Sequence, residues 1–546
     1  MTTANRKIFD FHGGLELDEH KSISTSRPIE IAPIPPLLVL PIIQHIGNAA
    51  KVSVSVGDTV LKGQCIANSE GRVSARVHAS SSGKVIAIEP RSVPHPSNLK
   101  VESVVIQTDG RDREIDTSNV GVTQFKTLST RDIHQRIQDA GIVGLGGAGF
   151  PSHIKLNVGE QPVNTLILNA AECEPYISCD DMLMREHAEE IVNGLRIMQY
   201  ALSAQHCIIG IEDNKVEAFS ALQKAITDQD DIELVRVPTR YPAGGERQLI
   251  YTLTGQQAPS QGRPLDIGIV CHNVGTAFAV NNAIVDGQPL TSRVVTITGS
   301  GIPQPRNMQV RLGTPIEFLL EHCHSNKNDI GKILIGGPMM GYQINAYHAP
   351  ITKTCNCVLV MHQRDITAAE TPLPCIRCGD CNDVCPVNLL PQQLYWHARA
   401  QEFDNIQDYN LFDCIECGCC DVVCPSRIPL VQYFRFSKTT IWQQERDKEK
   451  SDKARERHEL RLERLEREKR EKRERHNRKK AALKKSPEQK DDPKKAAILA
   501  AMKRVQEKKT QTSAAPANTE NLNKEQQAKI DEADARRNKQ KESESS

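Results

Sequence analysis

Long apolar runs and aromatic residues are both scarce in this 546-residue chain, and each scarcity excludes a class of protein. The best candidate stretch, Pro36–Ile43, is eight residues long and is broken by Pro41. A membrane-spanning helix needs about 18 to 20 apolar residues, so none is expected. Residues 1–12 lack the basic start and apolar centre of a secretory signal, which favours a chain that stays in the cytoplasm. Aromatic residues make up only 4% of the chain, and we expect no nucleic-acid partner because base stacking depends on them.

Net charge is also small, at +1, but the two parts of the chain differ in sign. Residues 441–546 hold 32 Lys and Arg against 22 Asp and Glu, a net charge of +10. Residues 1–440 hold 37 against 46, a net charge of −9. A mildly acidic body, long enough for several domains, is therefore followed by a basic tail.

Cysteine is abundant, with 17 residues, nine of which lie between Cys375 and Cys424. Thiols stay reduced in the cytoplasm, so we interpret these residues as metal ligands rather than disulfides. The spacing C-x2-C-x2-C-x3-C-P occurs twice, 39 residues apart. The first copy runs from Cys375 to Pro386 and the second from Cys414 to Pro425.

This repeated spacing predicts two [4Fe-4S] clusters of the bacterial ferredoxin type. Three closely spaced thiolates surround one cluster, while the fourth cysteine, followed by proline, binds the other. We expect the first cluster to be bound by Cys375, Cys378, Cys381 and Cys424. We expect the second to be bound by Cys414, Cys417, Cys420 and Cys385. Structural zinc is the alternative, but it requires neither two matched quartets nor the C-P signature.

Three other cysteines are interpreted as non-ligands. Cys419 adjoins Cys420 but breaks the spacing, which makes it a bystander. Cys355 and Cys357 lie in an apolar segment and are expected to be strand residues.

The pattern of apolar residues divides the body further. After an N-terminal arm, 1–29, residues 30–108 look all-β, since Val52, Val54 and Val56 alternate with polar residues. They resemble the barrel-sandwich fold of biotinyl and lipoyl carrier domains. The hairpin tip that holds the modified lysine in a carrier reads Glu70-Gly71-Arg72 here, so a structural role is expected.

Residues 127–260 alternate predicted helices (182–202, 217–226) with strands (166–168, 207–211, 232–237), which is typical of an α/β domain. Ser129 and Asp132 fit a capping box at the first helix. Residues 262–350 resemble a small β-grasp (SLBB-like) module, and residues 366–440 form the cysteine-motif segment. The tail, 441–546, is expected to be disordered or a solvated single helix, because it has too few apolar residues to fold alone.

A glycine-rich loop, Gly144-Leu-Gly146-Gly147-Ala-Gly149, follows a predicted helix rather than a strand. That order counts against a Rossmann dinucleotide site. Its backbone N–H groups still offer close access to a phosphate or an aromatic ring system. Taken alone, the loop could equally be a tight turn between two elements.

Three more motifs follow this loop, in the segments 169–175, 241–246 and 272–276. Together with residues 144–155, they closely resemble the flavin and nucleotide segments of the NADH-oxidising flavoprotein subunit of respiratory complex I. The order of all the parts, over about residues 8–440, resembles the RnfC (RsxC) family, the C subunits of Rnf ion-translocating electron transport complexes. The implied fold is a multidomain α/β and β protein with an α-helical two-cluster ferredoxin domain.

This resemblance implies a set of cofactor-binding residues. Those expected near FMN and the nicotinamide are Gly144, Gly146, Gly147, Lys155 (at the FMN phosphate), Asn169, Asn273, Thr276, Gly244 and Glu246. Glu172 and Glu174 would contact the nucleotide, and Phe150 would stack on its adenine. The sequence departs from the family pattern at Leu145, Ala171, Gly245 and His272. Flavin binding tolerates these departures better than tight NADH binding does.

The resemblance implies an NADH:ferredoxin-type ion-translocating oxidoreductase subunit, peripheral on the cytoplasmic side of a bacterial inner membrane. Its partners would be the other, membrane-embedded subunits, and its cofactors FMN and two [4Fe-4S] clusters, with NADH as substrate. No catalytic acid or base is expected, since hydride transfer needs none. Two alternatives stay open: an iron–sulfur adaptor with an empty flavin fold, and a soluble NADH dehydrogenase or hydrogenase subunit. The tail would be a solvated spacer or a basic patch for anionic lipid.

Overall fold

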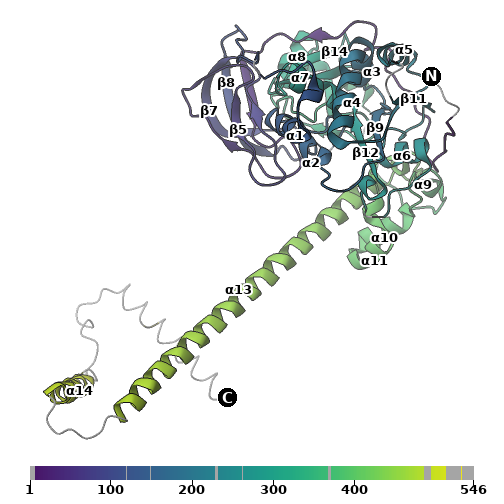
Figure 1. Cartoon of the computed structure of the whole chain (residues 1–546). Coiled ribbons are helices and arrows are strands. Elements are labelled where there is room, and N and C mark those ends of the chain that lie inside the picture. The colour runs from purple at the N-terminus through teal and green to yellow at the C-terminus, as the bar shows by residue number, and fades with distance from the viewer. Residues whose placement is uncertain are drawn as a thin grey trace. The chain divides into compact units, whose positions relative to one another are not determined.

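The computed structural model describes residues 6–118, 120–147, 149–227, 231–260, 262–366, 371–484, 493–511 and 531. The chain divides into two compact units, residues 1–446 and 447–546. Four sheets lie in the first unit, which we call the body (Figure 1). Short 3-10 helices connect its parts at Phe125–Thr127, Pro264–Ile267, Lys327–Asp329, Gln363–Asp365 and Leu411–Asp413.

Residues 37–108 form two small antiparallel sheets with one shared apolar core, here called the β-sandwich module. One sheet has the order β2-β8-β7-β4 and the other β3-β5-β6. The strands are β2 (Leu37–Pro41), β3 (Lys51–Val52), β4 (Thr59–Val60), β5 (Cys65–Asn68), β6 (Val77–His78), β7 (Gly83–Ser92) and β8 (Lys100–Thr108). Leu38 pairs with Ile106 and Leu40 with Val104, and all four are fully buried. The strand expected from Val52 to Val56 does not form over that length, and β3 covers only Lys51 and Val52.

A four-stranded parallel sheet of order β11-β10-β9-β12 forms the centre of the α/β unit, residues 125–285. Its strands are β9 (Thr165–Ala170), β10 (His206–Glu212), β11 (Ile232–Val237) and β12 (Ile269–Asn273). Its helices are α1 (Thr130–Asp139), α2 (Ser152–Leu156), α3 (Cys179–Glu186), α4 (Ala188–Leu202), α5 (Val216–Ala225), α6 (Glu246–Thr254) and α7 (Val274–Val285). Leu166 and Leu168 face the core shared with α4 and α7, whereas Ile167 packs with α6 on the other face.

Two expectations for this unit need correction. The helix predicted over 182–202 is two helices, because His187 between them has non-helical backbone angles (φ −129°, ψ 36°). The boundary expected between 260 and 262 falls inside the unit, because β12 pairs with β9. The capping box of Ser129 and Asp132 at α1 is confirmed.

A six-stranded mixed sheet of order β1-β14-β13-β17-β15-β16 follows, here called the mixed-sheet module. Its elements are β1 (Glu30–Ile31), β13 (Ser292–Thr298), β14 (Arg306–Arg311), α8 (Ile316–His322), β15 (Ile330–Ile335), β16 (Tyr342–Ile344) and β17 (Cys357–His362). The boundary expected at 350 is too early, because β17 lies between β13 and β15 and pairs with both. Cys357 begins β17 and Cys355 is buried beside it, as expected of strand-segment residues.

Residues 371–446, the cysteine-motif module, are built from short helices and the start of a long one. These are α9 (Asp380–Asp383), α10 (Pro391–Ala400), α11 (Phe403–Asp408), α12 (Cys419–Val422) and α13 (Leu430–Lys484). Leu394, Ile406, Leu411 and Phe434 form its small apolar core.

The N-terminal segment, residues 6–27, runs along the body without regular structure and joins two of its parts. Arg6 forms an ion pair with Glu233 at 2.7 Å in the α/β unit. The backbone N–H of Gly14 donates to the carbonyl of Val384 at 2.9 Å in the cysteine-motif module.

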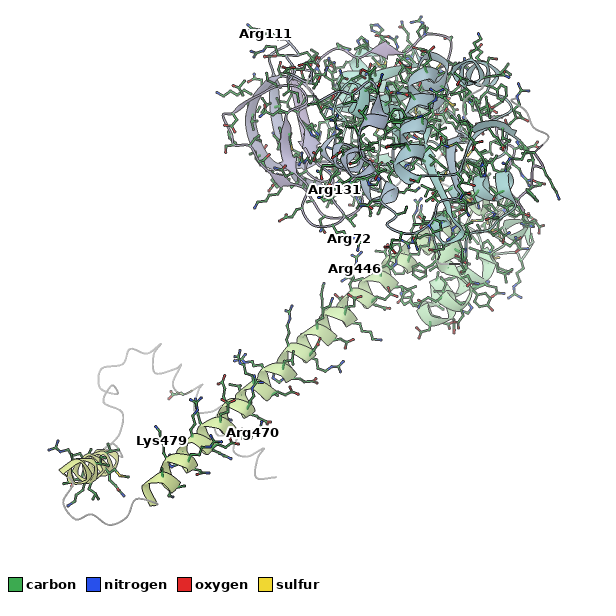
Figure 2. The ribbon with its side chains drawn as sticks, viewed as in Figure 1. Arg72, Arg111, Arg131, Arg446, Arg470 and Lys479 are labelled. Atoms are coloured by element: carbon green, nitrogen blue, oxygen red, sulfur yellow. The ribbon has the colours of Figure 1, made fainter. Side chains whose placement is uncertain are left out.

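The second unit continues α13 and contains α14 (Pro493–Gln511). From Asp447 to Ala482 every residue of α13 is exposed, and charged side chains such as Arg470 and Lys479 project from it (Figure 2). Ion pairs one turn apart, for example Lys453–Glu449 at 3.5 Å, stabilise such a helix modestly. Of the two expectations for the tail, the solvated single helix describes residues 447–484. Within the described ranges, no helix is long and apolar enough to cross a bilayer.

Lys353 joins three parts of the body. The side chain is 1% exposed, and its ammonium group donates to the carbonyls of Arg76 at 2.6 Å and Gly141 at 2.7 Å. These residues belong to the β-sandwich module and the α/β unit, while Lys353 itself precedes β17. Burial lowers the pKa of Lys353 to about 7.

This lowered pKa predicts a pH-dependent stability. Above about pH 7 the unfolded chain holds a proton on Lys353 that the folded chain has lost, so unfolding becomes harder as pH rises towards the ordinary lysine pKa. In Lys353→Met this contribution disappears, at most about 1.4 kcal/mol per pH unit. Thermal unfolding followed between about pH 7 and about pH 10 should show the wild-type advantage growing with pH. The exposed Lys51→Met is the control, and parallel profiles for wild type and Lys353→Met would contradict the interpretation.

Candidate functional site

The four predicted motifs meet at one edge of the parallel sheet. The Asn169 segment leaves β9 and Asn273 ends β12, and parallel strands carry their carboxyl ends to the same edge. The glycine loop packs on the start of α7, where the backbone N–H of Leu145 donates to Thr276 Oγ1 at 3.0 Å. The Asn169 amide donates to the carbonyl of Gly244 at 2.8 Å. Residues up to 131 positions apart thus form a single site.

Both predicted flavin-contacting amides are already hydrogen-bonded within the chain. Asn273 Oδ1 accepts from the backbone N–H of Gly275 at 2.8 Å, which caps α7, and its Nδ2 donates to Asp180 at 2.6 Å. Asn169 Oδ1 accepts from the N–H of Ala171 at 3.0 Å. These side chains therefore fix the shape of the loops that surround the site.

Three features leave room for a phosphorylated ring cofactor such as FMN. Lys155 on α2 is 34% exposed and pairs with Glu246 at 2.7 Å, so its charge is accessible at the edge of the site. A Cβ at Gly147 would meet no described atom within 4 Å. The buried ring of His272 has an Nε2 atom with no hydrogen-bond partner among the described residues. A cation, an open glycine loop and an unused ring nitrogen fit an anionic group joined to a flat ring.

His272 is a residue whose use was missed from sequence, where it counted only as a departure from the family pattern. Burial, and secondarily the charge of Lys155, hold its pKa well below the ordinary value, so the ring is neutral. A neutral imidazole can donate or accept one hydrogen bond.

The two carboxylates expected to contact the nucleotide make internal contacts. Glu172 is 7% exposed, and its carboxylate accepts from the backbone N–H groups of Asp180 at 2.9 Å and Asp181 at 3.3 Å, at the start of α3. Glu174 Oε1 accepts from the N–H groups of Met339 at 2.7 Å and Met340 at 3.0 Å, and burial raises the pKa of Glu174.

Phe150 contributes through its backbone, whose carbonyl accepts from the N–H of Gly144 at 2.8 Å and closes the glycine loop. Gly146 packs closely on the start of α7, because a Cβ added to it would lie 2.8 Å from the Cβ of Asn273. A larger residue at Gly146 would therefore push the loop away from α7.

Buried charges beneath the loop support it. Asp180 has a pKa raised to about 7, by burial and by the neighbouring Glu172. Arg293, on β13, donates to the carbonyl of Leu145 at 3.3 Å. Lys21, from the N-terminal segment, donates to the carbonyl of Glu172. No sequence motif marks these three residues, and only the fold brings them together.

Two hollows in the cysteine-motif module sort the cysteines into quartets. One is lined by Cys375, Cys378, Cys381 and Cys424. The other is lined by Cys385, Cys414, Cys417 and Cys420, with Cys419 also at its wall. Each hollow thus receives three cysteines of one motif and the last cysteine of the other.

The two hollows differ in exposure. Cys385, Cys417 and Cys420 are at most 8% exposed, whereas Cys378 in the first hollow is exposed. Beside it, Ile376 is 67% exposed. The first hollow therefore has an exposed cysteine in its wall, whereas three of the four quartet cysteines of the second are buried, and we call the second the enclosed hollow.

Comparisons with known proteins place each part. Family models match residues 9–111 as an RnfC barrel sandwich hybrid domain, 137–282 as a Nuo51 FMN-binding domain and 374–428 as a 4Fe-4S dicluster domain. The C subunit of the ion-translocating oxidoreductase complex of Salmonella arizonae is 43% identical over 507 residues, covering 93% of this chain and 74% of that protein. The corresponding protein of Serratia proteamaculans, which has the same name, is 44% identical over 502 residues, covering 92% and 70%. A crystal structure of an NAD+-reducing [NiFe]-hydrogenase is 18% identical and covers 56% of this chain and 61% of its own, at a TM-score of 0.41 too low for structural argument.

The contact between Glu174 and residues 336–341 yields a testable prediction. In Glu174→Ala the backbone N–H groups of Met339 and Met340 lose their charged acceptor, at a cost of about 1.5–3 kcal/mol for each such hydrogen bond. Hydrogen exchange measured by mass spectrometry should show faster exchange across residues 336–341. Glu174→Gln keeps a side-chain oxygen and should retain most of the protection. Unchanged exchange in the alanine variant would show that the carboxylate does not hold this loop.

Proposed function

The chain belongs to the family of C subunits of ion-translocating oxidoreductase complexes, and on this premise we propose that it is the peripheral electron-input subunit of such a complex. It passes electrons from NADH, through FMN and two [4Fe-4S] clusters, to the membrane-embedded subunits. The observation that carries this proposal is the coexistence, in one body, of the loops around Lys155 and of two cysteine quartets.

The chain's own residues position the cofactors. Lys155 would hold the FMN phosphate, and the backbone N–H groups of Gly146 and Gly147 would face its ring. Asn169, Asn273 and Thr276 keep the surrounding loops in place. When bound, FMN accepts two electrons as hydride and releases them singly to one-electron iron–sulfur carriers. No side chain is needed as a general acid or base.

The cysteines bind the clusters by crossing over. Cys375, Cys378, Cys381 and Cys424 bind one cluster, and Cys414, Cys417, Cys420 and Cys385 bind the other, which agrees with the residues that line the two hollows. Cys419 takes no iron. This arrangement keeps the two clusters close enough for electron transfer between them.

The protein docks on the cytoplasmic side of a bacterial inner membrane through its partner subunits. The exposed basic helix of the tail acts as a spacer, or adds attraction to anionic lipid of about 1 kcal/mol per basic residue near the surface.

A second candidate is an iron–sulfur adaptor whose flavin fold is empty. The four departures from the family pattern, at Leu145, Ala171, Gly245 and His272, motivate it. The internal hydrogen bonds of Glu172 and Glu174 count against the nucleotide contact expected of them. Purified complex that contains intact clusters but no FMN would support the adaptor and overturn the flavin relay.

The role of Lys155 predicts a loss of flavin affinity. Lys155→Ala removes the only charge assigned to the phosphate and leaves Glu246 facing it, so the Kd for FMN should rise by about 10- to 100-fold. Quenching of flavin fluorescence on titration of FMN into the flavin-depleted protein measures this. The exposed Lys126→Ala is the matched control and should bind FMN as wild type does. An unchanged Kd in Lys155→Ala would remove this residue from the site.

The crossed quartets predict different iron contents for cysteine variants. Wild-type protein should contain about eight iron atoms per chain, as two four-iron clusters require. Cys419→Ser should keep all of them, whereas Cys378→Ser should lose the first cluster's share or convert that cluster to a three-iron form. Iron and acid-labile sulfide analysis, together with low-temperature EPR, measures both. Loss of a cluster signal in Cys419→Ser would make Cys419 a ligand.

A further inference from the structure

The enclosed hollow of the second cysteine motif lies against the flavin side of the body. A small apolar cluster, here called the junction, joins them, and its buried members are Tyr241, Cys417 and Cys419. Leu15 of the N-terminal segment, Cys173 from the loop after β9 and Met339 from the loop after β15 pack around it. Segments from three modules therefore meet at this motif.

Tyr241 is the central contact of the junction. Its side chain is 3% exposed, and its hydroxyl donates to the carbonyl of Cys417 at 2.6 Å. Its backbone is paired with Leu15 in both directions, at 2.9 and 2.7 Å, so the ring has a fixed position. Only three residues further along, Gly244 accepts from Asn169 and donates its N–H to Cys173 Sγ at 3.2 Å. Tyr241 thus links the loop at the flavin side directly to the backbone of the second motif.

Met339 makes a second link. Its backbone N–H donates to Glu174, and its carbonyl lies where a Cβ on Gly418 would come within 3.1 Å. The segment between Cys417 and Cys420 is thereby held from two sides by residues of the flavin side.

The first motif has different surroundings. Among the described members of the junction, none is a cysteine of its quartet, which consists of Cys375, Cys378, Cys381 and Cys424. Cys378 is exposed, and Leu373 and Ile376 are 63% and 67% exposed beside it. This end of the module faces outward.

We propose that the two clusters have fixed and different roles, and that Tyr241 is a positioning residue for one of them. The cluster in the enclosed hollow exchanges electrons with the flavin, and the cluster at Cys378 exchanges them with the partner subunit. The proposal rests on the function proposed above. One electron at a time leaves the flavin reduced by NADH, reduces the oxidised enclosed cluster, and passes to the oxidised outer cluster. Tyr241 keeps its proton throughout and is not itself oxidised.

The hydroxyl of Tyr241 acts through the peptide group that follows Cys417. Donation to the carbonyl polarises this peptide group, which Cys417 shares with Gly418 at the wall of the enclosed hollow. Hydrogen bonds around the sulfurs and burial set the reduction potential of such a cluster. The positive end of the hydroxyl dipole also favours the added electron. Its removal should therefore make the enclosed cluster harder to reduce.

The test compares Tyr241→Phe with Tyr200→Phe in the full-length protein with its clusters. Tyr200 also donates its hydroxyl to a backbone carbonyl, that of Leu128 at 3.3 Å, but in the α/β unit away from the cysteines. Redox titration followed by low-temperature EPR gives the potential of each cluster. A water-soluble gadolinium chelate identifies the outer cluster, because its signal relaxes faster when the chelate is added.

In Tyr241→Phe we expect the reduction potential of the enclosed cluster to become more negative. This cluster is the one whose EPR signal the chelate does not affect. The other signal, and both signals in Tyr200→Phe, should stay at their wild-type potentials. Flavin-to-cluster electron transfer measured by stopped flow should slow in the same variant. A shift in the chelate-sensitive signal, or no shift in either, would overturn the assignment of Tyr241. If both signals respond equally to the chelate, the enclosed and outer roles are wrong. Protein without cluster signals would instead contradict the proposed function itself.

Discussion

The close packing of the glycine loop on the first turn of α7 is the constraint on which the site depends. Gly146 lies so near Asn273 that any side chain would displace it, while Thr276 holds the N–H of Leu145. Because Asn273 also ends β12, the loop position is tied to the edge of the parallel sheet. The same sheet edge releases the Asn169 segment, whose amide holds Gly244. A shift of α7 would therefore displace the glycine loop, and through β12 it would also disturb the Asn169 and Gly244 segments.

Sequence patterns predicted the elements that depend only on residues close together in the chain. The spacing of the two cysteine motifs predicted the quartets that line the hollows, because short helices place nearby cysteines around one space. The βαβ pattern predicted β9, β10 and β11 with their helices. It could not show that β12 completes the same sheet, because pairing between Thr165 and Ile269 depends on a contact 104 residues apart. The boundary at 350 was wrong for a similar reason, since β17 takes its place only through β13 and β15.

The residue roles implied by the family motifs also divide into those that depend on local sequence and those that depend on tertiary contacts. The glycine loop packs on α7 and Lys155 is accessible beside Glu246, and their contact with a cofactor stays a prediction. Glu172 and Glu174 have internal partners that lie on α3 and in the loop after β15, and no motif connects these segments. Lys353, Arg293 and Tyr241 are buried at contacts between modules, so their importance depends on tertiary packing that a single sequence does not reveal.

The pairing of β1 with β14 has a consequence for the order in which this chain folds during synthesis. Glu30 pairs with Met308, and Gly14 pairs with Val384 still later in the chain. A ribosome adds about 5–20 residues per second, so the first of these partners follows after some tens of seconds. Throughout this interval β1 has no partner strand, whereas all the strands of the β-sandwich module that follows it have already been synthesised. The mixed sheet therefore closes only after the α/β unit has been synthesised, and until then the backbone N–H and C=O groups of Glu30 and Ile31 lack the strand that they pair with.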